Sequence, residues 1–503
     1  MIATVPSATL LGVQGRAVSV EVHVSNGLPG FTVVGLPDAS CREARDRVRA
    51  ALLSSGLPWP LKRVTVNLAP SGVRKAGSQL DLAIAIALLV AVERIRPDRV
   101  QGMAFVGELG LDGSIRPVAG TVPLVHALGS PTVVVPARSV GEAELVGHHR
   151  VRAATDLIAL VAAIDGDEPW PRAPVLPVPE RDHEPDLADV RGQPIARLAL
   201  ELAAAGGHHL LMVGPPGAGK TMLAKRLPGL LPDLTPDDAL DATMVHSAAG
   251  VPLAAGLVRR PPFRAPHHGA STVSLTGGGS TMMRPGEISL AHHGVLFLDE
   301  LGEFQAPVVD ALRQPLEEGV IRVSRAAGTV TFPARVLLIA AMNPCPCGQG
   351  SAPGLCTCSD AARARYHRRV SGPILDRFDL RIDVAAPEVD DLIGGEPGEA
   401  TASVRERVAT ARERAQHRGV RCNAELAAEH LDEVAPLSDD ATTLLEDTLR
   451  AGQLTGRGLH RIRRLALTLA DREGRGGPLS VEDVALALQL RAVPAPFEIG
   501  AVV

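Results

Sequence analysis

The chain has 503 residues, which predicts roughly two to four domains, and its 46% hydrophobic content excludes a wholly disordered protein. The formal net charge is −5 and aromatic residues make up 2%, so the composition excludes a globally basic nucleic-acid binder and disfavours rows of aromatic stacking platforms. Any contact with phosphates must come from local patches, and arginine supplies most of their charge because the chain has four lysines.

A cytoplasmic protein with no membrane partner is expected from the apolar segments and the cysteines. Residues 1–20 lack the basic stretch and apolar core of a secretory signal, and the longest apolar run, residues 82–92, is too short to cross a bilayer. Six cysteines are too few for a disulfide framework in a chain of this length.

The first block, residues 1–164, mixes apolar runs with helical patterns and predicts an α+β domain. Its expected strands lie at 17–24, 31–34, 64–68 and 132–135, and its expected helices at 40–54 and 79–92. Residues 165–189 are rich in proline and acidic residues without a hydrophobic period, so they are expected to form a linker.

Two further blocks follow the linker, which makes the whole an α/β multidomain protein. Residues 190–390 alternate short apolar runs with helical patterns and predict a parallel sheet covered by helices. Residues 391–503 are nearly all helical and are expected to form a C-terminal helical lid.

A phosphate-binding loop follows a buried strand in the second block. The apolar run 210–213 leads into Gly214, Pro215, Pro216, Gly217, Ala218, Gly219, Lys220 and Thr221, after which a helical pattern begins. In this strand–loop–helix context, the G-x-x-x-x-G-K-[ST] pattern lets backbone N–H groups converge on phosphate oxygens. Lys220 would reach the β- and γ-phosphates of ATP, and Thr221 would ligate Mg²⁺.

Two more apolar runs end in residues suited to ATP hydrolysis. Residues 295–298 are followed by Asp299, which would bind Mg²⁺, and by Glu300, which would orient and deprotonate the attacking water. Residues 336–342 are followed by Asn343, whose amide could hold that water, because ligands of open α/β sheets bind outside the carboxyl ends of the strands. The alternative for Asn343 is a turn residue before a proline.

Two arginines are candidates for contacts with the transferring phosphoryl group. Arg377, within 373–380, carries the guanidinium that suits such a charge distribution, or else forms a surface salt bridge with Asp376 or Asp379. Arg457 could reach a nucleotide from the helical block, although Arg461 and Arg464 compete for the same role.

Four of the six cysteines cluster within fourteen residues. Cys345, Cys347, Cys356 and Cys358 could supply four thiolates to one Zn²⁺ ion, although two C-x-C pairs are less usual than C-x₂-C pairs. The alternative is a loop of reduced cysteines. A basic run between 363 and 369 follows, which could contact a phosphate backbone or form a solvated helix face or subunit interface.

The order of these motifs resembles that of AAA+ ATPases and, more narrowly, of the Mg-chelatase-like ComM/YifB family. The specific features are Phe-Arg-Ala-Pro-His-His at 263–268, Gly-Gly-Gly-Ser at 277–280, Arg-Pro-Gly-Glu-Ile-Ser-Leu-Ala-His at 284–292 and Asn-Pro-Cys-Pro-Cys-Gly at 343–348. Matching features in the first block are Gly-Leu-Pro-Asp at 35–38, Val-Asn-Leu-Ala-Pro at 66–70 and Gly-Glu-Leu-Gly-Leu-Asp-Gly at 107–113, so the resemblance covers nearly the whole chain.

This resemblance implies a ring, expected to be hexameric, that hydrolyses ATP and acts as a DNA helicase in branch migration during natural transformation. In such a ring Arg377 would act on the neighbouring subunit's nucleotide, and Asn343 and Arg457 would be the two sensors. The alternatives are a metal-chelatase motor subunit and a protein-remodelling chaperone. The glycine-rich stretch 277–280 has histidines nearby at 267, 268, 292 and 293. It is expected either as the tip of an insertion aimed at the ring pore or as a β-hairpin whose nearby histidines are exposed to solvent.

The first block resembles the proteolytic domain of Lon without its catalytic dyad. The stretch Lys75–Gln79 has Gln79 at the position of the serine nucleophile, and the stretch 117–122 has Val122 at the position of the catalytic lysine. No protease activity is therefore expected from this block.

Overall fold

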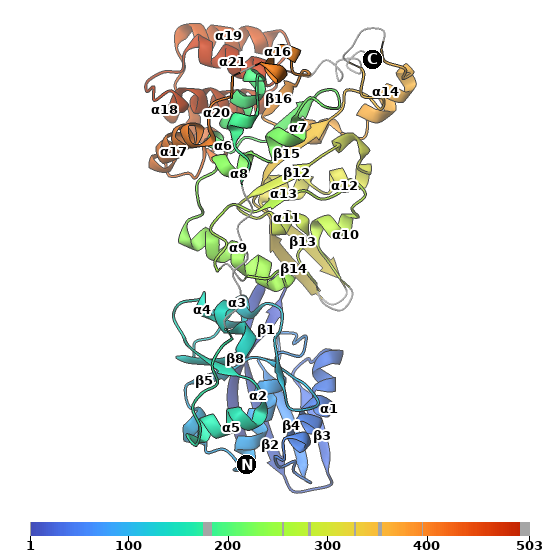
Figure 1. The fold of residues 1–503 in the computed structure, drawn as a ribbon, viewed down its shortest axis with the longest axis vertical. Helices are drawn as coiled ribbons and strands as arrows, with labels where there is room; N and C mark the ends of the chain where they lie inside the picture. The colour runs from blue at the N-terminus through green and yellow to red at the C-terminus, as the bar shows by residue number, and fades with distance from the viewer. Residues whose placement is uncertain are drawn as a thin grey trace.

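The computed structural model of the chain describes residues 2–174, 184–253, 256–279, 283–325, 328–350, 355–394 and 396–492. Three regions are stacked along the longest axis: an N-terminal region (residues 2–165), a core (residues 187–393) and a helical region (residues 401–490) (Figure 1). Residues 175–183 of the expected linker, Ser280 of the expected tip and residues 395 and 493–503 of the last block lie outside the described residues. Within the described ranges, no helix combines the length and apolar character that a membrane crossing requires.

The N-terminal region begins with a four-stranded sheet. Its order is β1 (Ile2–Leu11), β2 (Gln14–Ser25), β4 (Arg63–Ala69) and β3 (Gly30–Val34), with the last pair parallel and the other two antiparallel. Val64, Val66 and Leu68 of β4 are buried, because alternate side chains of a strand face the same side. Helix α2 (Asp81–Ala91) packs on β1 and β2 with every residue buried, and α1 (Ala39–Ser54) packs on α2.

A second, parallel sheet completes the N-terminal region in the order β5 (Met103–Phe105), β8 (Thr132–Pro136) and β9 (Arg150–Ala154). The shorter elements around it are β6 (Glu108–Leu109), β7 (Ile115–Arg116), α3 (Thr121–His126), α4 (Val140–Glu144), α5 (Leu157–Asp165), and the 3₁₀ turns η1 (Pro97–Val100) and η2 (Ala137–Ser139). The six strands and helices predicted in this region are present near their expected bounds, which confirms them.

The core is a five-stranded parallel sheet that confirms the predicted α/β arrangement. Its order is β11 (Phe263–Arg264), β12 (Val295–Leu298), β15 (Leu337–Met342), β10 (Leu210–Val213) and β16 (Leu380–Asp383). Strands β10, β12 and β15 are buried along their full length, as continuous apolar runs predict for a sheet covered on both faces.

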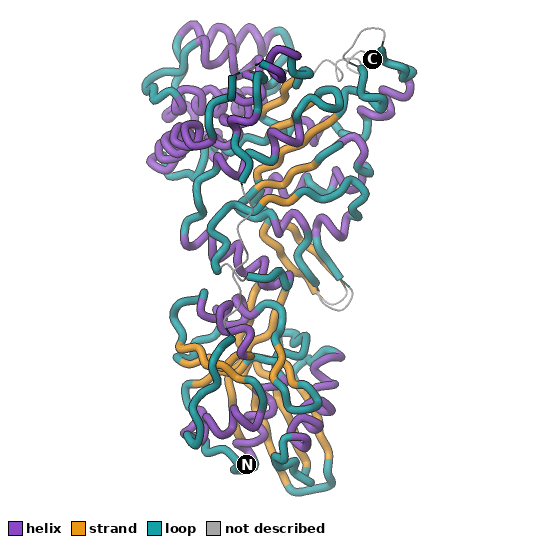
Figure 2. Tube along the Cα trace, viewed as in Figure 1, coloured by secondary structure: helices purple, strands orange, loops and turns teal. Residues whose placement is uncertain are grey.

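Helices and a hairpin pack around this sheet (Figure 2). They are η3 (Leu187–Asp189), α6 (Pro194–Gly206), α7 (Lys220–Ala224), α8 (Leu227–Leu230), α9 (Pro236–Ala249), α10 (Thr272–Thr276), α11 (Glu287–Leu290), η4 (Leu301–Glu303), α12 (Ala306–Asp310), α13 (Arg313–Glu318), the hairpin β13 (Val320–Arg325) and β14 (Gly328–Pro333), α14 (Asp360–His367), α15 (Gly372–Leu375) and α16 (Val389–Ile393).

The helical region packs on α6 of the core through α17 and α20. Its elements are α17 (Thr401–His417), η5 (Asn423–Glu425), η6 (Ala428–His430), α18 (Leu431–Val434), α19 (Asp439–Arg450), α20 (Gly456–Arg472) and α21 (Val481–Leu490). Glu201 of α6, which is buried, accepts hydrogen bonds at 2.7 Å from Arg407 of α17 and from Arg472 of α20, so a paired charge ties the two regions together.

The N-terminal region and the core share one apolar cluster. It runs from Leu10, Val122 and Val125 into Val245 and Ala248 of α9 without a break. The backbone N–H of Gly120 donates to the carbonyl of Ser247 at 2.9 Å, and helices α3 and α9 face each other at the waist of the molecule (Figure 1).

The expectation of exposed histidines near the glycine-rich stretch is wrong for two of the four. His292 is buried and its Nδ1 accepts a hydrogen bond from the backbone N–H of Arg335, and the His293 side chain is also buried. Burial, with a smaller contribution from the adjacent His293, lowers the pKa of His292 to about 2, so this imidazole is neutral. Helices α10 and α11 lie on either side of the glycine-rich stretch, and paired backbone hydrogen bonds between Gly278 and Arg284 lie between them.

Candidate active site

The phosphate loop connects the carboxyl end of β10 to the first turn of α7. Gly217 and Gly219 adopt φ of +82° and +86°, a backbone conformation that residues other than glycine rarely adopt. A Cβ atom added at Gly217 would meet nothing within 4 Å, so this part of the loop borders open space. The backbone N–H groups of the loop are therefore accessible to an anion.

Lys220 lies folded over this loop. Its side chain is nearly buried, with 8% of the residue exposed, and its Nζ donates to the carbonyls of Gly214 at 2.7 Å and Pro215 at 2.9 Å. Burial lowers the pKa of Lys220, while the carboxylates of Asp299 and Glu300 act in the opposite direction. These bonds to backbone carbonyls can be exchanged for stronger bonds to a phosphate.

Thr221 and Asp299 form the oxygen pair expected of a magnesium site. The Thr221 hydroxyl donates to Asp299 Oδ2 at 2.7 Å, across from the end of β12. A hydroxyl and a carboxylate beside a phosphate site provide the hard oxygen ligands that Mg²⁺ prefers.

Asn343 completes the group at the carboxyl edge of the sheet. It follows β15, which lies between β12 and β10, and its Oδ1 accepts a hydrogen bond of 3.2 Å from Lys220 Nζ. Lys220, Thr221, Asp299 and Asn343 were predicted from three separate motifs, and the strand order brings them together.

Glu300 is held by a histidine that the sequence did not indicate. Its backbone has φ of +53°, a left-handed conformation that is strained for a residue with a side chain. His268 Nδ1 lies 3.1 Å from Glu300 Oε2. His268 comes shortly after β11, and the pairing of β11 with β12 brings it to the carboxyl edge beside Glu300. This strand pairing left no signal in the sequence.

Tyr366 is a second residue that the motifs missed. This buried side chain packs directly on Gly302, two residues after Glu300, and its hydroxyl receives a hydrogen bond from the backbone of Asn343. Burial raises the pKa of Tyr366, so the phenol stays protonated. The ring thereby joins the segments that carry Glu300 and Asn343.

Arg377 lies at the opposite edge of the sheet. Strand β16 runs parallel to β10, with Leu380 beside Leu210. Arg377 therefore lies near the amino end of β10, whereas the phosphate loop follows its carboxyl end. At about 3.3 Å per residue, the four residues of β10 separate the two edges by about 13 Å. Arg377 donates to the Pro373 carbonyl at 2.7 Å and pairs with Glu317, so the proposed pairing with Asp376 or Asp379 is wrong.

Arg457 lies with Arg377 rather than with Lys220. Burial, together with the nearby guanidinium groups of Arg461, Arg457 and Arg313, lowers the pKa of Arg377. Arg461 is engaged with Asp379 at 2.6 Å and with the Arg377 carbonyl at 3.1 Å, whereas Arg457 is exposed at the start of α20. Arg464, like Arg461, is only half-exposed, so Arg457 is the most exposed of the three arginines considered for this role.

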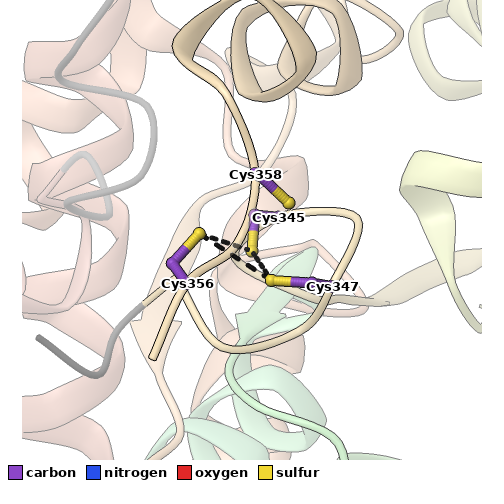
Figure 3. Close-up of side chains that lie close together, drawn as sticks. All are labelled: Cys345, Cys347, Cys356 and Cys358. Atoms are coloured by element: carbon purple, nitrogen blue, oxygen red, sulfur yellow. Dashed lines mark hydrogen bonds between the residues drawn. The ribbon is translucent and has the colours of Figure 1, made fainter. Parts of the chain in front are cut away.

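The four clustered cysteines converge on one point beyond Asn343 (Figure 3). The Sγ atom of Cys345 lies 3.3 Å from that of Cys347 and 3.7 Å from that of Cys356, and all four sulfurs lie within 4.8 Å of one another. Burial raises the pKa of Cys345 to about 12, whereas hydrogen bonds from the backbone of Gln349 and Thr357 lower the pKa of Cys347 to about 5.

A cavity of about 820 Å³ lies away from this site. Its lining includes His209, Gly294 and Leu337, which precede or begin β10, β12 and β15, and residues of α17. It therefore opens at the amino edge of the sheet, and none of the converging groups described above lines it.

Three family models match consecutive parts of the chain. The model described as "Subunit ChlI of Mg-chelatase" matches residues 20–139, "Magnesium chelatase, subunit ChlI" matches 186–392 and "Magnesium chelatase, subunit ChlI C-terminal" matches 398–491. The magnesium-chelatase 38 kDa subunit of Rhodobacter capsulatus is 26% identical over 213 residues, which are 39% of this chain and 55% of that protein.

Two other relatives match along nearly the full length. The competence protein ComM of Haemophilus influenzae is 43% identical over 482 residues, or 94% of each chain. The uncharacterized protein YifB of Escherichia coli is 42% identical over 466 residues, which are 92% of this chain and 91% of YifB. On this similarity and on the site geometry, the chain belongs to the ComM/YifB family of Mg-chelatase-like AAA+ proteins.

Proposed function

We propose that the protein is a cytoplasmic, Mg²⁺-dependent ATPase that assembles as a ring and uses ATP hydrolysis to remodel DNA, as a helicase or branch-migration motor. Membership of a Mg-chelatase-like AAA+ family implies the use of ATP and Mg²⁺. The observation that carries the proposal is the convergence of Lys220, Thr221, Asp299 and Asn343 at one edge of the core sheet, with Arg377 at the other.

The residues at the carboxyl edge fit a Mg²⁺-bound nucleotide. The loop 214–219 and Lys220 would hold the phosphates, and Thr221 and Asp299 would hold the metal. When bound, Mg²⁺ would neutralise charge on the phosphates. Glu300 would accept a proton from the attacking water, which Asn343 would orient, once the contact between Glu300 and His268 is released.

The ring is supported by the distance between the two edges of the sheet. Because Arg377 and Arg457 lie at the amino edge, they would serve the nucleotide of a neighbouring subunit instead of their own. A guanidinium supplied in this way stabilises the transition state and contributes about 10³–10⁵ in rate in other phosphoryl-transfer enzymes. A hexamer is the ring size that the family resemblance favours.

Action on DNA is supported by one relative and one surface. The relative from Haemophilus influenzae is named as a competence protein. In and just after α14, Arg363 pairs with Asp360 and Arg369 pairs with Glu303, whereas Arg365 and Arg368 are exposed. Two exposed arginines per subunit would give a ring a repeated positive surface for phosphates.

The N-terminal region is proposed to keep a Lon-like fold without proteolysis. Gln79 is buried and its amide donates to Thr9 Oγ1 at 3.2 Å, so no nucleophile stands at this position. Val122, at the position expected of the lysine base, is fully buried in the apolar cluster shared with the core. The region would therefore serve assembly or DNA contact.

A metal-chelatase motor subunit is the alternative, since the Rhodobacter capsulatus relative and all three family models carry that name. The N-terminal region does not separate the two functions, because the model that matches residues 20–139 carries the chelatase name as well.

The test is the rate of ATP hydrolysis in the presence of single-stranded DNA, forked DNA, unfolded protein or a porphyrin, at low and high salt. We expect stimulation by DNA that falls steeply as salt rises, because phosphate contacts release counterions. Arg365→Ala together with Arg368→Ala should reduce the stimulation and leave the basal rate unchanged. Stimulation by the porphyrin or by unfolded protein, with none by DNA at low salt, would contradict the proposed substrate.

A further inference from the structure

The cysteine cluster has the dimensions of a four-thiolate metal site. In a tetrahedral zinc site with Zn–S bonds of about 2.3 Å, neighbouring sulfurs are about 3.8 Å apart. The Sγ distances from Cys356 to Cys345 and to Cys347 are both 3.7 Å, and the Sγ atom of Cys358 lies within 4.8 Å of the other three.

Neither a disulfide nor a set of hydrogen-bonded thiols accounts for the cluster as well as a metal site does. A disulfide requires an S–S distance of about 2.05 Å, and these cysteines are all free. Thiols are weak hydrogen-bond donors, so contacts among the sulfurs do not explain why four of them converge. The Cys347 sulfur also receives hydrogen bonds from the backbone of Gln349 and Thr357, an arrangement typical of the groups that orient a thiolate ligand.

The loop that carries the cluster is packed against the phosphate loop. A Cβ atom added at Gly348 would lie 2.7 Å from Cδ of Pro216, so the Gly348 backbone packs directly against the Pro216 ring. Gly348 adopts φ of +80°, which permits this close approach.

The same loop is fixed to the segment that carries the proposed water-orienting group. Cys345 comes two residues after Asn343, and His367 Nε2 donates to the carbonyl of the intervening Pro344 at 2.8 Å. On its other side, Asn343 is held through its backbone by Tyr366. A bound ion would tie this loop together between Asn343 and the phosphate loop.

We infer that Cys345, Cys347, Cys356 and Cys358 bind one Zn²⁺ ion, and that this ion positions Asn343 relative to the phosphate loop. The second part of this inference rests on the ATPase function proposed above, whereas the first does not. Zn²⁺ suits the role because it binds four thiolates tetrahedrally and has no redox chemistry of its own. The site acts on hydrolysis through Asn343, so it is a positioning element.

The first experiment measures the metal content of the full-length protein. We expect about one zinc per chain by elemental analysis, released when a mercurial reagent blocks the thiols. Reconstitution of the metal-free protein with Co²⁺ should give the charge-transfer and d–d bands of a tetrahedral thiolate complex. A chain that retains no zinc and gives no such bands, or that holds iron instead, would overturn the inference.

Two variants and a control connect the metal to these residues. Cys356→Ser and Cys358→Ser, at half-buried positions less critical for folding than Cys345, should each lose the zinc while the protein keeps its circular dichroism spectrum. Cys422→Ala, which removes a buried cysteine of the helical region, should retain it. Zinc retained in both serine variants would show that the cluster is not the site.

The second experiment separates positioning from binding. Loss of zinc should lower kcat for ATP about tenfold, because a small displacement of a group that orients a reactant reduces the rate, and should change KM for ATP by less than about threefold. Re-adding Zn²⁺ to the metal-free wild-type protein should restore kcat. An unchanged kcat without zinc would overturn the positioning role. Zinc bound by a wild-type protein that hydrolyses no ATP would instead contradict the proposed function while leaving the metal site intact.

Discussion

The chain contains two buried lysines, and the difference between them separates a site from a structural contact. Lys75 in the N-terminal region is fully buried and Lys220 in the core is nearly so. Both direct Nζ to backbone carbonyls, Lys75 to Pro70 and Lys220 to Gly214 and Pro215. Burial lowers the pKa of both. Burial and hydrogen bonding alone therefore do not distinguish them.

The surroundings distinguish the two lysines. Lys220 has two carboxylates nearby, an amide oxygen within 3.2 Å and a loop that borders open space. The titratable group near Lys75 is the thiol of Cys41. Burial and the nearby charge of Asp38 raise the pKa of this thiol to about 12. A protonated thiol beside a sealed lysine offers neither a nucleophile nor a path for a substrate. The comparison shows that a buried lysine forms part of a site when other polar side chains converge on it and open space beside it admits a ligand.

The largest effect expected from this contrast is that of removing Lys220. Lys220→Ala should reduce ATP hydrolysis to background, at least about 100-fold, because the phosphates lose the cation that meets them. Lys225→Ala, five residues later and exposed, should keep the rate within about twofold. The rate of phosphate release measures both, and a Lys220→Ala protein with normal turnover would place the site elsewhere.

The next effect concerns the amino edge of the core. If Arg377 acts between subunits as proposed, Arg377→Ala should lower turnover about 10³-fold in the assembled protein, because the transition state in the neighbouring subunit would lose a guanidinium. Mixing Arg377→Ala with Lys220→Ala subunits should restore part of the activity, since some interfaces then combine an intact Lys220 with an intact Arg377. Failure of the mixture to recover any activity, in rings shown to contain both variants, would contradict action between subunits.

Glu300→Gln is expected to act on the chemical step alone. It should lower kcat about 10²-fold, because the water loses its general base, while ATP still binds with its affinity within about threefold. Glu303→Gln makes the same change three residues later, where the carboxylate pairs with Arg369, and should leave kcat nearly unchanged. Titration with a fluorescent ATP analogue separates affinity from turnover, and a parallel loss of both would contradict the role of Glu300 as a base.

The smallest effect is that of Lys75, which should change stability and not turnover. The pKa of Lys75 is lowered in the folded protein from an ordinary value of 10.5, so in the range below that value the unfolded chain binds more protons at this position. The free energy of unfolding of the wild type should therefore rise, relative to that of Lys75→Met, as the pH is increased toward 10.5. Urea titrations across this range measure the difference, and a difference that stays constant with pH would contradict the lowered pKa of Lys75.

The sequence predicted the elements of the core sheet and the residues at its carboxyl edge because local signals define them. The apolar run 210–213, which ends before a glycine, coincides with β10. The apolar run 295–298, which ends before an aspartate, coincides with β12. The order of these strands could not be read from the sequence. It is this order that places Asn343 next to Lys220 and Arg377 at the far edge.

The residues that the sequence missed depend on contacts between distant segments. His292 is buried because its ring meets the backbone of Arg335, 43 residues away, so the histidine pair gave no local sign of burial. His268 and Tyr366 reach Glu300 and Asn343 from a neighbouring strand end and from a helix after the cysteine loop. No hydrophobic period or motif spacing encodes such encounters, because they are set by the packing of the whole core.

The turn between β1 and β2 has a consequence for how the chain can be divided. Gly12 lies so close to Val330 of β14 that a Cβ atom there would come within 2.3 Å of its side chain. A fragment that lacks the N-terminal region would expose Val330, Phe332 and the apolar side of α9 to solvent, and such an exposed apolar surface promotes aggregation. The amino-terminal third of the chain thus acts as a built-in cover for the motor, and expression of the motor alone should give insoluble protein unless those positions are made polar.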